Sequence, residues 1–289
     1  MKLTAIILLL ILAVSALCGC TTPAPLADIA ATTLPVYEFT TLLTDGTDLT
    51  VTQLVTENVS CLHDYSLSVR QVRALEGAQL VVLSGGGLED FMSDLLAGKD
   101  VIDCGAGIPL EESCHADDHE HHHHEADPHF WLSPDCAKIM AQNICSGLIA
   151  RYPQHEAVFN ANLARLLAQL EQLNAYAAEQ LANLTCRKMI TFHDGFTYFA
   201  KAFDLQILAA LEEESGSEAS AAELKELITL TNDHNLNAIF TEDNGSDRSA
   251  KVIAEATGAK VYSLTMAMSG DSYFTLMYRN IDTVKEALG

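Results

Sequence analysis

The sequence predicts an α/β protein with two Rossmann-like lobes, each built on a parallel sheet, joined by one long rigid helix. Short apolar runs alternate with amphipathic segments from Asp28 to about Cys145, and the alternation resumes after residue 186. Between these parts, residues 155–184 contain no glycine or proline and repeat leucine at helical spacing. Strand–helix alternation favours parallel sheets covered on both faces, and 289 residues are enough for two cores. We expect lobes at 28–150 and 186–289, with the linking helix at 153–185.

The first lobe is expected to begin with a strand and to alternate from there. Short apolar runs predict strands at residues 27–34, 48–55, 79–85 and 100–105. Amphipathic segments predict helices at 36–43, at 66–78 and from about Leu88. The second of these helices has Ser66 or Ser68 available as its N-terminal cap. A further helix is expected to start near Pro134, because proline is favoured in a first helical turn.

The linking helix and the second lobe continue the pattern. At ~1.5 Å per residue, the helix at 155–184 would extend roughly 45 Å, long enough to act as a rigid spine between the lobes. Strands are then expected at 187–193, 205–211, 237–242 and 260–264. Helices are expected at 195–203, 221–234, 249–258 and 272–288.

The N-terminus has the pattern of an exported lipoprotein. Lys2 precedes the apolar run LTAIILLLILAVSAL, which is rather short for a membrane span. The tetrad Leu17-Cys18-Gly19-Cys20 resembles a lipobox, so we expect a signal peptide at 1–19, a lipid on Cys20 and a linker at 20–27. Such an anchor would hold a soluble domain at a membrane surface. The alternative is an ordinary signal peptide that happens to contain cysteines.

The charge and the remaining cysteines narrow the kind of partner. The formal net charge of −23 argues against nucleic acid, which binds through Lys and Arg, and suits a cationic ligand better. No CxxC pair occurs after Cys20, so a zinc ribbon is not expected. An exported chain can form disulfides, and the sequence leaves their pairing open. The cysteines concerned are Cys61, Cys104, Cys114, Cys136, Cys145 and Cys186.

Three histidines stand near the ends of expected elements. His63 follows one strand after a short loop, and His193 ends another. His129 stands just before the helix expected near Pro134. Ligands of doubly wound α/β domains collect beyond the carboxyl ends of the strands, so the three imidazoles could meet around one cation in the cleft between the lobes. Taken singly, each is more often a polar loop residue. Imidazole suits Zn²⁺ and also Mn²⁺ or Fe²⁺.

At these residues the chain resembles the zinc/manganese-type metal-binding solute-binding lipoproteins of bacterial ABC transporters, from about Asp28 to Gly289. That family's motifs HxY, DPHxWLSP and FHDxFxYF match His63–Tyr65, Asp127–Pro134 and Phe192–Phe199. The resemblance implies that the metal ligands are His63, His129 and His193. It also implies that the long helix is the spine between the lobes, that an ABC permease is the partner, and that no enzymatic turnover is involved.

The chain departs from the family's pattern where a fourth ligand is often found. Many relatives carry an Asp at the position aligned with Thr265, and threonine is a poor substitute for it. The site is then three histidines with water, or it recruits Glu242 from FTEDN or Asp271 from SGDSY. Three neutral nitrogens favour Zn²⁺ over Mn²⁺, which prefers carboxylates.

A stretch rich in histidine and acidic residues at 111–126 leads into the DPH motif, as in the zinc-importing members of the family. It offers little that could pack, so we expect weak, exchangeable imidazole sites that raise the local zinc concentration. A solvated loop with incidental metal affinity is the alternative. The imidazoles concerned are those of His115, His119, His121, His122, His123 and His124.

The sequence therefore predicts a monomeric, lipid-anchored receptor on the outer face of the cell membrane (the periplasmic side in a Gram-negative cell). It would bind Zn²⁺ and deliver it to a permease. A manganese- or iron-binding homologue and an adhesin on the same fold are alternatives. A secreted zinc hydrolase using the same histidines is the rival from another class, but the sequence lacks HExxH and other compact hydrolase motifs.

Overall fold

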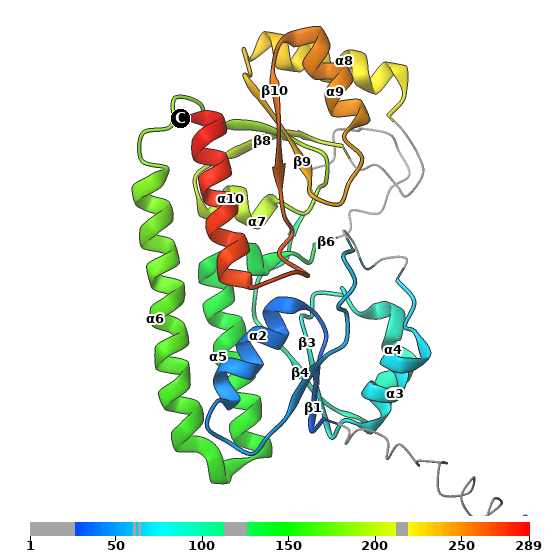
Figure 1. Ribbon diagram of the computed structural model, residues 1–289, viewed down its shortest axis with the longest axis vertical. Coiled ribbons are helices and arrows are strands. Elements are labelled where there is room, and N and C mark those ends of the chain that lie inside the picture. Colours follow the sequence, from blue (N-terminus) through cyan, green and yellow to red (C-terminus); the bar gives the residue numbers. More distant parts are fainter. Residues whose placement is uncertain (1–26, 60–61, 63–64, 113–125, 212–218) are drawn as a thin grey trace, which may run out of the picture.

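The computed structural model describes residues 27–59, 62, 65–112, 126–211 and 219–289. Figure 1 shows two lobes, one above the other, with a long helix running along one side. The predicted signal peptide, Cys20, Cys61, His63, Cys114 and the histidines from His115 to His124 lie outside the described residues, so those predictions stay predictions. Within the described residues, no helix combines the length and the apolar composition needed to cross a bilayer.

The first lobe is built on a parallel sheet with strand order β2-β1-β3-β4. Its strands are β1 (Ile29–Ala31), β2 (Val51–Gln53), β3 (Leu80–Leu83) and β4 (Asp100–Asp103). Alternate strand residues face opposite sides of the sheet. Ile29 and Val82 therefore join the core beneath α2 (Leu34–Thr44) and α5 (Pro134–Arg151), whereas Ala30 and Val81 pack toward α3 (Val69–Gly77). The short helices η1 (Asp90–Met92) and α4 (Ser93–Leu96) follow β3.

The second lobe repeats this design with strand order β10-β9-β7-β8, again all parallel. Its strands are β7 (Lys188–Thr191), β8 (Gln206–Ala210), β9 (Ala238–Glu242) and β10 (Lys260–Leu264). Ile190 and Ile239 pack toward α8 (Ala221–Asp233) and α9 (Arg248–Thr257). Met189 and Phe240 join the core shared with α7 (Thr197–Ala202) and α10 (Tyr273–Leu288). The predicted pair of α/β lobes is confirmed.

Two helix starts follow directly from the local sequence. Ser68 caps α3 in a capping box with Gln71, as the serine pair before that helix predicted. Ser133 caps α5, its side chain accepting a hydrogen bond from the Cys136 amide, and Pro134 occupies the first helical position. These caps fix where α3 and α5 begin.

The spine is α6 (Glu156–Gln180), preceded by the 3-10 turn η3 (Pro153–His155). It is shorter than the predicted helix at both ends. Pro153 starts a separate 3-10 turn, and beyond Gln180 the Arg187 guanidinium donates to the Leu181 carbonyl at 2.9 Å. The helix packs against α2 and α5 of the first lobe and against α10 of the second, so it spans both lobes (Figure 1).

The C-terminal helix also ties the lobes together. At its start, Glu38 of α2 accepts hydrogen bonds from the Tyr273 amide at 2.6 Å and from the Ser272 hydroxyl at 2.9 Å. One apolar core runs through both lobes and includes Phe39 from the first and Met277 from the second. The two lobes are therefore packed against each other, because this shared core excludes water from the region where they meet.

A small ladder marks the entrance to the DPH segment. Strands β5 (Glu111–Glu112) and β6 (Ala126–Asp127) pair antiparallel, with Glu111 opposite Asp127. The 3-10 helix η2 (Phe130–Leu132) follows and leads into α5. The ladder thus fixes the backbone on both sides of residues 113–125 and holds the start of the segment that carries His129.

Candidate functional site

Two neighbouring strands of the second lobe deliver a histidine and a carboxylate to the same edge. β7 is followed by His193, and its neighbour β9 ends with Glu242. The carboxyl ends of parallel strands lie together, and the Nδ1 of His193 is 3.9 Å from the Oε2 of Glu242. His129 enters from the first lobe at the start of η2, and its ring centroid lies 5.3 Å from that of His193. The structure therefore brings together side chains that are far apart in the sequence.

All three side chains are buried. Relative exposure is 2% for His129, 6% for His193 and 4% for Glu242. Among the described residues, the Nε2 of His129 and the Oε1 of Glu242 have no hydrogen-bond partner. An unsatisfied buried polar atom costs about 1–3 kcal/mol, and a nitrogen and a carboxylate oxygen are both metal donors. The arrangement thus fits a cation site better than a packed core.

The carboxyl of Glu242 is held partly protonated near neutral pH. Burial raises its pKa to about 7, the nearby Asp243 carboxylate adds to the increase, and His129 opposes it. A cation placed beside this carboxyl would favour its charged form. Ionisation of Glu242 would therefore be coupled to the binding of a cation beside it.

Asp127 fixes the ring of His129. Its Oδ1 lies 2.9 Å from the His129 Nδ1 and accepts a hydrogen bond from the His129 amide at 2.8 Å. Burial alone would raise the pKa of the Asp127 carboxyl, but the hydrogen bond and the charge of His129 hold it below its ordinary value. With Nδ1 held by a carboxylate, Nε2 is the nitrogen left for a ligand, as in the carboxylate–histidine pairs of metal sites.

The role of Asp127 was not predicted from the sequence, although a local signal was present. Asp127 precedes Pro128, which biases it toward an extended backbone and away from the helical region. Aspartate side chains commonly fold back onto backbone two residues further on. In D-P-H, that backbone belongs to the histidine itself.

The walls around His129 are close and aromatic. Its ring packs edge to face on Trp131 with centroids 5.2 Å apart. On another side, a Cβ added to Gly195 would lie 2.6 Å from the His129 Nδ1 and 2.6 Å from a Met266 methyl. Only glycine allows the loop after β7 to approach this closely. Gly195 thus explains why the FHDGF segment can bring His193 beside His129.

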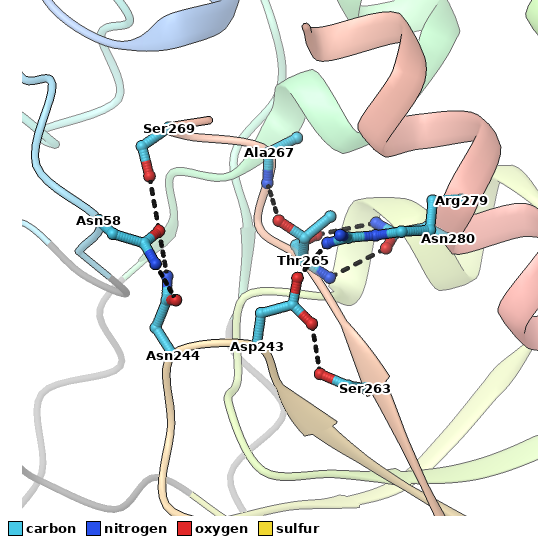
Figure 2. Close-up of polar contacts among 9 residues, drawn as sticks. All are labelled: Asn58, Asp243, Asn244, Ser263, Thr265, Ala267, Ser269, Arg279 and Asn280. Atoms are coloured by element: carbon cyan, nitrogen blue, oxygen red, sulfur yellow. Dashed lines mark hydrogen bonds and ion pairs between the residues drawn. The ribbon is translucent and has the colours of Figure 1, made fainter. Parts of the chain in front are cut away.

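Thr265, which stands where many relatives have an aspartate ligand, makes hydrogen bonds with the backbone around it. The Thr265 hydroxyl accepts from the Ala267 amide at 3.1 Å, and Asn280 of α10 pairs with both the amide and the carbonyl of Thr265 (Figure 2). Thr265 therefore shapes the turn after β10. Asp271 is exposed on the loop before α10. Of the two carboxylates predicted as a fourth ligand, Glu242 lies beside an imidazole in the described part of the chain, that of His193.

The described residues do not complete a metal site by themselves. They contain no group of three His, Cys, Asp or Glu side chains placed to hold one ion. A metal site at His129, His193 and Glu242 would need a further ligand, and the one predicted, His63, lies outside the described residues. The described cysteines are free thiols, namely Cys104, Cys136, Cys145 and Cys186.

Comparison with known proteins gives a family match over nearly the whole chain. The family described as zinc-uptake complex component A, periplasmic (ZnuA), matches residues 29–287. The match includes His129, His193 and Glu242. It also spans both lobes and the spine.

Individual relatives agree with this match. The zinc-binding lipoprotein AdcA of Streptococcus pneumoniae is 29% identical over 278 residues, which cover 90% of this chain and 55% of that protein. The chain thus spans about half the length of the curated relatives of this kind. A crystal structure of ZnuA superposes with a TM-score of 0.80 at 32% identity, covering 91% of this chain and 100% of that one. The Zn(II)-bound structure of AdcA from Streptococcus pneumoniae gives 0.75 at 27% identity, covering 91% and 57%.

Proposed function

Because the chain belongs to the ZnuA family of zinc-uptake components, we propose that it is a receptor that captures Zn²⁺ outside the cell membrane and delivers it to an ABC permease. In this proposal Cys20 carries the lipid anchor, and the cargo is held between the lobes. The zinc-binding names of the relatives and the Zn(II)-bound structure of AdcA support zinc as that cargo.

One observation carries the proposal. Two buried imidazoles from different lobes lie with their centroids 5.3 Å apart, and a buried carboxylate stands beside one of them. The Asp127 carboxylate leaves the Nε2 of His129 for a ligand. With His63 added, the donor set would be three imidazole nitrogens and the Glu242 carboxylate, a combination that suits Zn²⁺. Four protein ligands would leave no open position for the water that a zinc hydrolase activates, so this donor set suits a receptor better.

Calorimetry of the purified chain with Zn²⁺ tests this proposal. We expect one tight site per chain, and we expect His63→Ala, His129→Ala or His193→Ala to weaken it severely. The matched control is His155→Ala, because the His155 Nε2 pairs with Asp48 at 3.1 Å and its ring packs on Phe159, outside the site. A tight site that survived His129→Ala and His193→Ala would overturn the proposal.

The fourth ligand can be assigned with a second pair of variants. Glu242→Gln should weaken zinc binding, because it removes the carboxylate beside His193. Asp271→Asn changes an exposed side chain and should leave binding unchanged. The reverse result would make Asp271 the ligand.

The histidine-rich stretch is proposed to supply auxiliary weak sites. Deleting residues 115–125 should remove weak zinc binding and leave the tight site intact. Loss of the tight site with this deletion would contradict that division of labour, and retention of every weak site would make the stretch incidental.

A further inference from the structure

Two exposed asparagines bridge the lobes close to the candidate site. The Asn58 side-chain amide donates to the Asn244 Oδ1 at 2.5 Å, and the Asn244 amide donates back to the Asn58 Oδ1 at 2.8 Å (Figure 2). The Ser269 hydroxyl donates to the same Asn58 oxygen at 3.0 Å. Asn58 follows β2 of the first lobe, whereas Asn244 and Ser269 follow β9 and β10 of the second. We call these three residues the amide clasp.

On the second lobe, the amide clasp is joined directly to the candidate site. Asn244 stands two residues after Glu242, and the Gly245 amide donates to the Glu242 carbonyl at 3.1 Å, which closes a tight turn between them. The intervening Asp243 is held by Arg279 and Ser263 (Figure 2). A displacement of Asn244 therefore acts on a short, well-bonded segment that ends at the buried carboxylate.

On the first lobe, the amide clasp begins where the chain is tied to α3. Glu57 accepts hydrogen bonds from the Tyr65 hydroxyl at 2.7 Å and from the Gln71 side chain at 2.9 Å. Gln71 also donates to the Leu54 carbonyl at 2.8 Å. Asn58 is the next residue after Glu57, so the hydrogen bonds of Glu57 hold the backbone from which the Asn58 side chain contacts the second lobe.

The amide clasp differs in kind from a ligand. A side-chain amide is not a group that a zinc site prefers. The side chains of Asn58, Asn244 and Ser269 already hydrogen-bond to one another. Asn58 and Asn244 are exposed, so water can replace the two bonds between them when they break, whereas Ser269 is buried. A contact of this kind can open and close without unfolding a lobe.

We propose that the amide clasp limits the rate at which the bound ion leaves the site, so that Asn58, Asn244 and Ser269 set its residence time without ligating it. The inference rests on the proposed function, since it concerns the release of the ion captured between His129, His193 and Glu242. It makes the clasp residues positioning residues. Their removal should alter dissociation far more than association.

The test is stopped-flow release of Zn²⁺ from the full chain into excess chelator, with association rates measured in parallel. Asn58→Leu and Asn244→Leu keep the side-chain size and remove the hydrogen bonds. Each should speed release about tenfold, the factor that corresponds to ~1.4 kcal/mol, with little change in association. The double variant should be no faster than Asn58→Leu, because Asn58→Leu alone already removes all three bonds of the clasp. Asn160→Leu, at an exposed asparagine of α6, is the control and should match wild type.

A conservative variant separates positioning from general damage. Asn58→Asp keeps an oxygen that can accept from Asn244 and Ser269 but loses the bond that Asn58 donates. Its release rate should fall between wild type and Asn58→Leu. Unchanged release in both leucine variants, with the tight site present, would overturn the clasp and leave the proposed function standing. Absence of a tight zinc site in the wild-type chain would overturn both.

Discussion

Two of the contacts between the lobes have opposite character. In the buried contact, Trp131 is 0% exposed, its indole N–H donates to the Met266 carbonyl at 2.7 Å, and the Tyr273 hydroxyl donates to the Trp131 carbonyl at 2.7 Å. In the amide clasp, Asn58 and Asn244 exchange two hydrogen bonds, and both residues are exposed to solvent. Water excluded from the first contact cannot compensate a broken bond, whereas water at the second can.

Each of these contacts lies close in the chain to one residue of the candidate site. His129 stands two residues before Trp131, and Glu242 stands two residues before Asn244. His129 is therefore attached to the buried contact, which resists change. Glu242 is attached to the amide clasp, whose hydrogen bonds can exchange with water. If the amide clasp limits release, release would begin on the Glu242 side. Together with α6 and the shared core, the buried contact makes a large rigid-body opening of the lobes costly.

Removing the buried contact should have the largest effect on stability. Trp131→Ala deletes a fully buried side chain and its hydrogen bond to Met266, and should lower the free energy of unfolding by about 3–5 kcal/mol. Urea denaturation of the metal-free chain measures it. Val69→Ala, at a side chain 70% exposed, is the control and should change little. A loss below about 1 kcal/mol for Trp131→Ala would mean that the buried contact does not hold the lobes together.

The second prediction concerns the buried carboxyl of Glu242. Burial raises the pKa of Glu242 to about 7 from the ordinary 4.5, so the folded state prefers the protonated form. Its favourable contribution is complete below pH ~4.5 and is lost as the pH rises through about 7. For the metal-free chain this loss is about 3 kcal/mol, from ~1.4 kcal/mol per pKa unit.

Glu242→Gln removes that dependence. At pH 8 the metal-free variant should be more stable than wild type by up to about 3 kcal/mol, and the difference should shrink toward pH 5. Thermal unfolding in the presence of a chelator across this pH range measures it. Asp271→Asn, at an exposed carboxylate, should follow wild type at every pH. A difference that grew as the pH fell would show that the sign is wrong.

The third prediction tests how the buried side of the site holds its ligand. Asp127→Asn keeps the side-chain shape but replaces the carboxylate beside the His129 Nδ1. The imidazole then loses the partner that fixes its tautomer, and zinc affinity should fall about 10- to 100-fold. Calorimetric competition with a chelator measures the change. The control is Asp233→Asn at the exposed end of α8. Equal affinities for Asp127→Asn and wild type would remove Asp127 from the site.

The sequence could predict the features that depend on neighbouring residues. Apolar runs predicted one strand that ends at His193 and another that ends at Glu242. The second end is confirmed, whereas β7 ends two residues before His193, at Thr191. The Ser133–Pro134 pair marked the start of α5. The end of the spine was different. It depends on Arg187 reaching back to the Leu181 carbonyl and on the Thr185 amide bonding to the Leu288 carbonyl, and leucine periodicity carries no trace of either.

Contacts between the lobes could not be predicted in the same way. Trp131 and Met266 are 135 residues apart, and Asn58 and Asn244 are 186 apart. Asparagine in a loop is ordinarily a turn residue, and nothing in the local pattern pairs an asparagine of one lobe with an asparagine of the other. Asp127 is intermediate, since its short-range D-P-H signal was present but its role depended on the burial of His129.

The smallest expected effect on stability belongs to the amide clasp, and this is what separates it from the buried contact. Asn58→Leu breaks exposed hydrogen bonds that water can replace, so the free energy of unfolding of the metal-free chain should fall by no more than about 1 kcal/mol. Urea denaturation beside Asn160→Leu and Trp131→Ala measures the three on one scale. A loss comparable to that of Trp131→Ala would mean that both contacts hold the fold, and the distinction between a fixed side and an exchangeable side of the site would be lost.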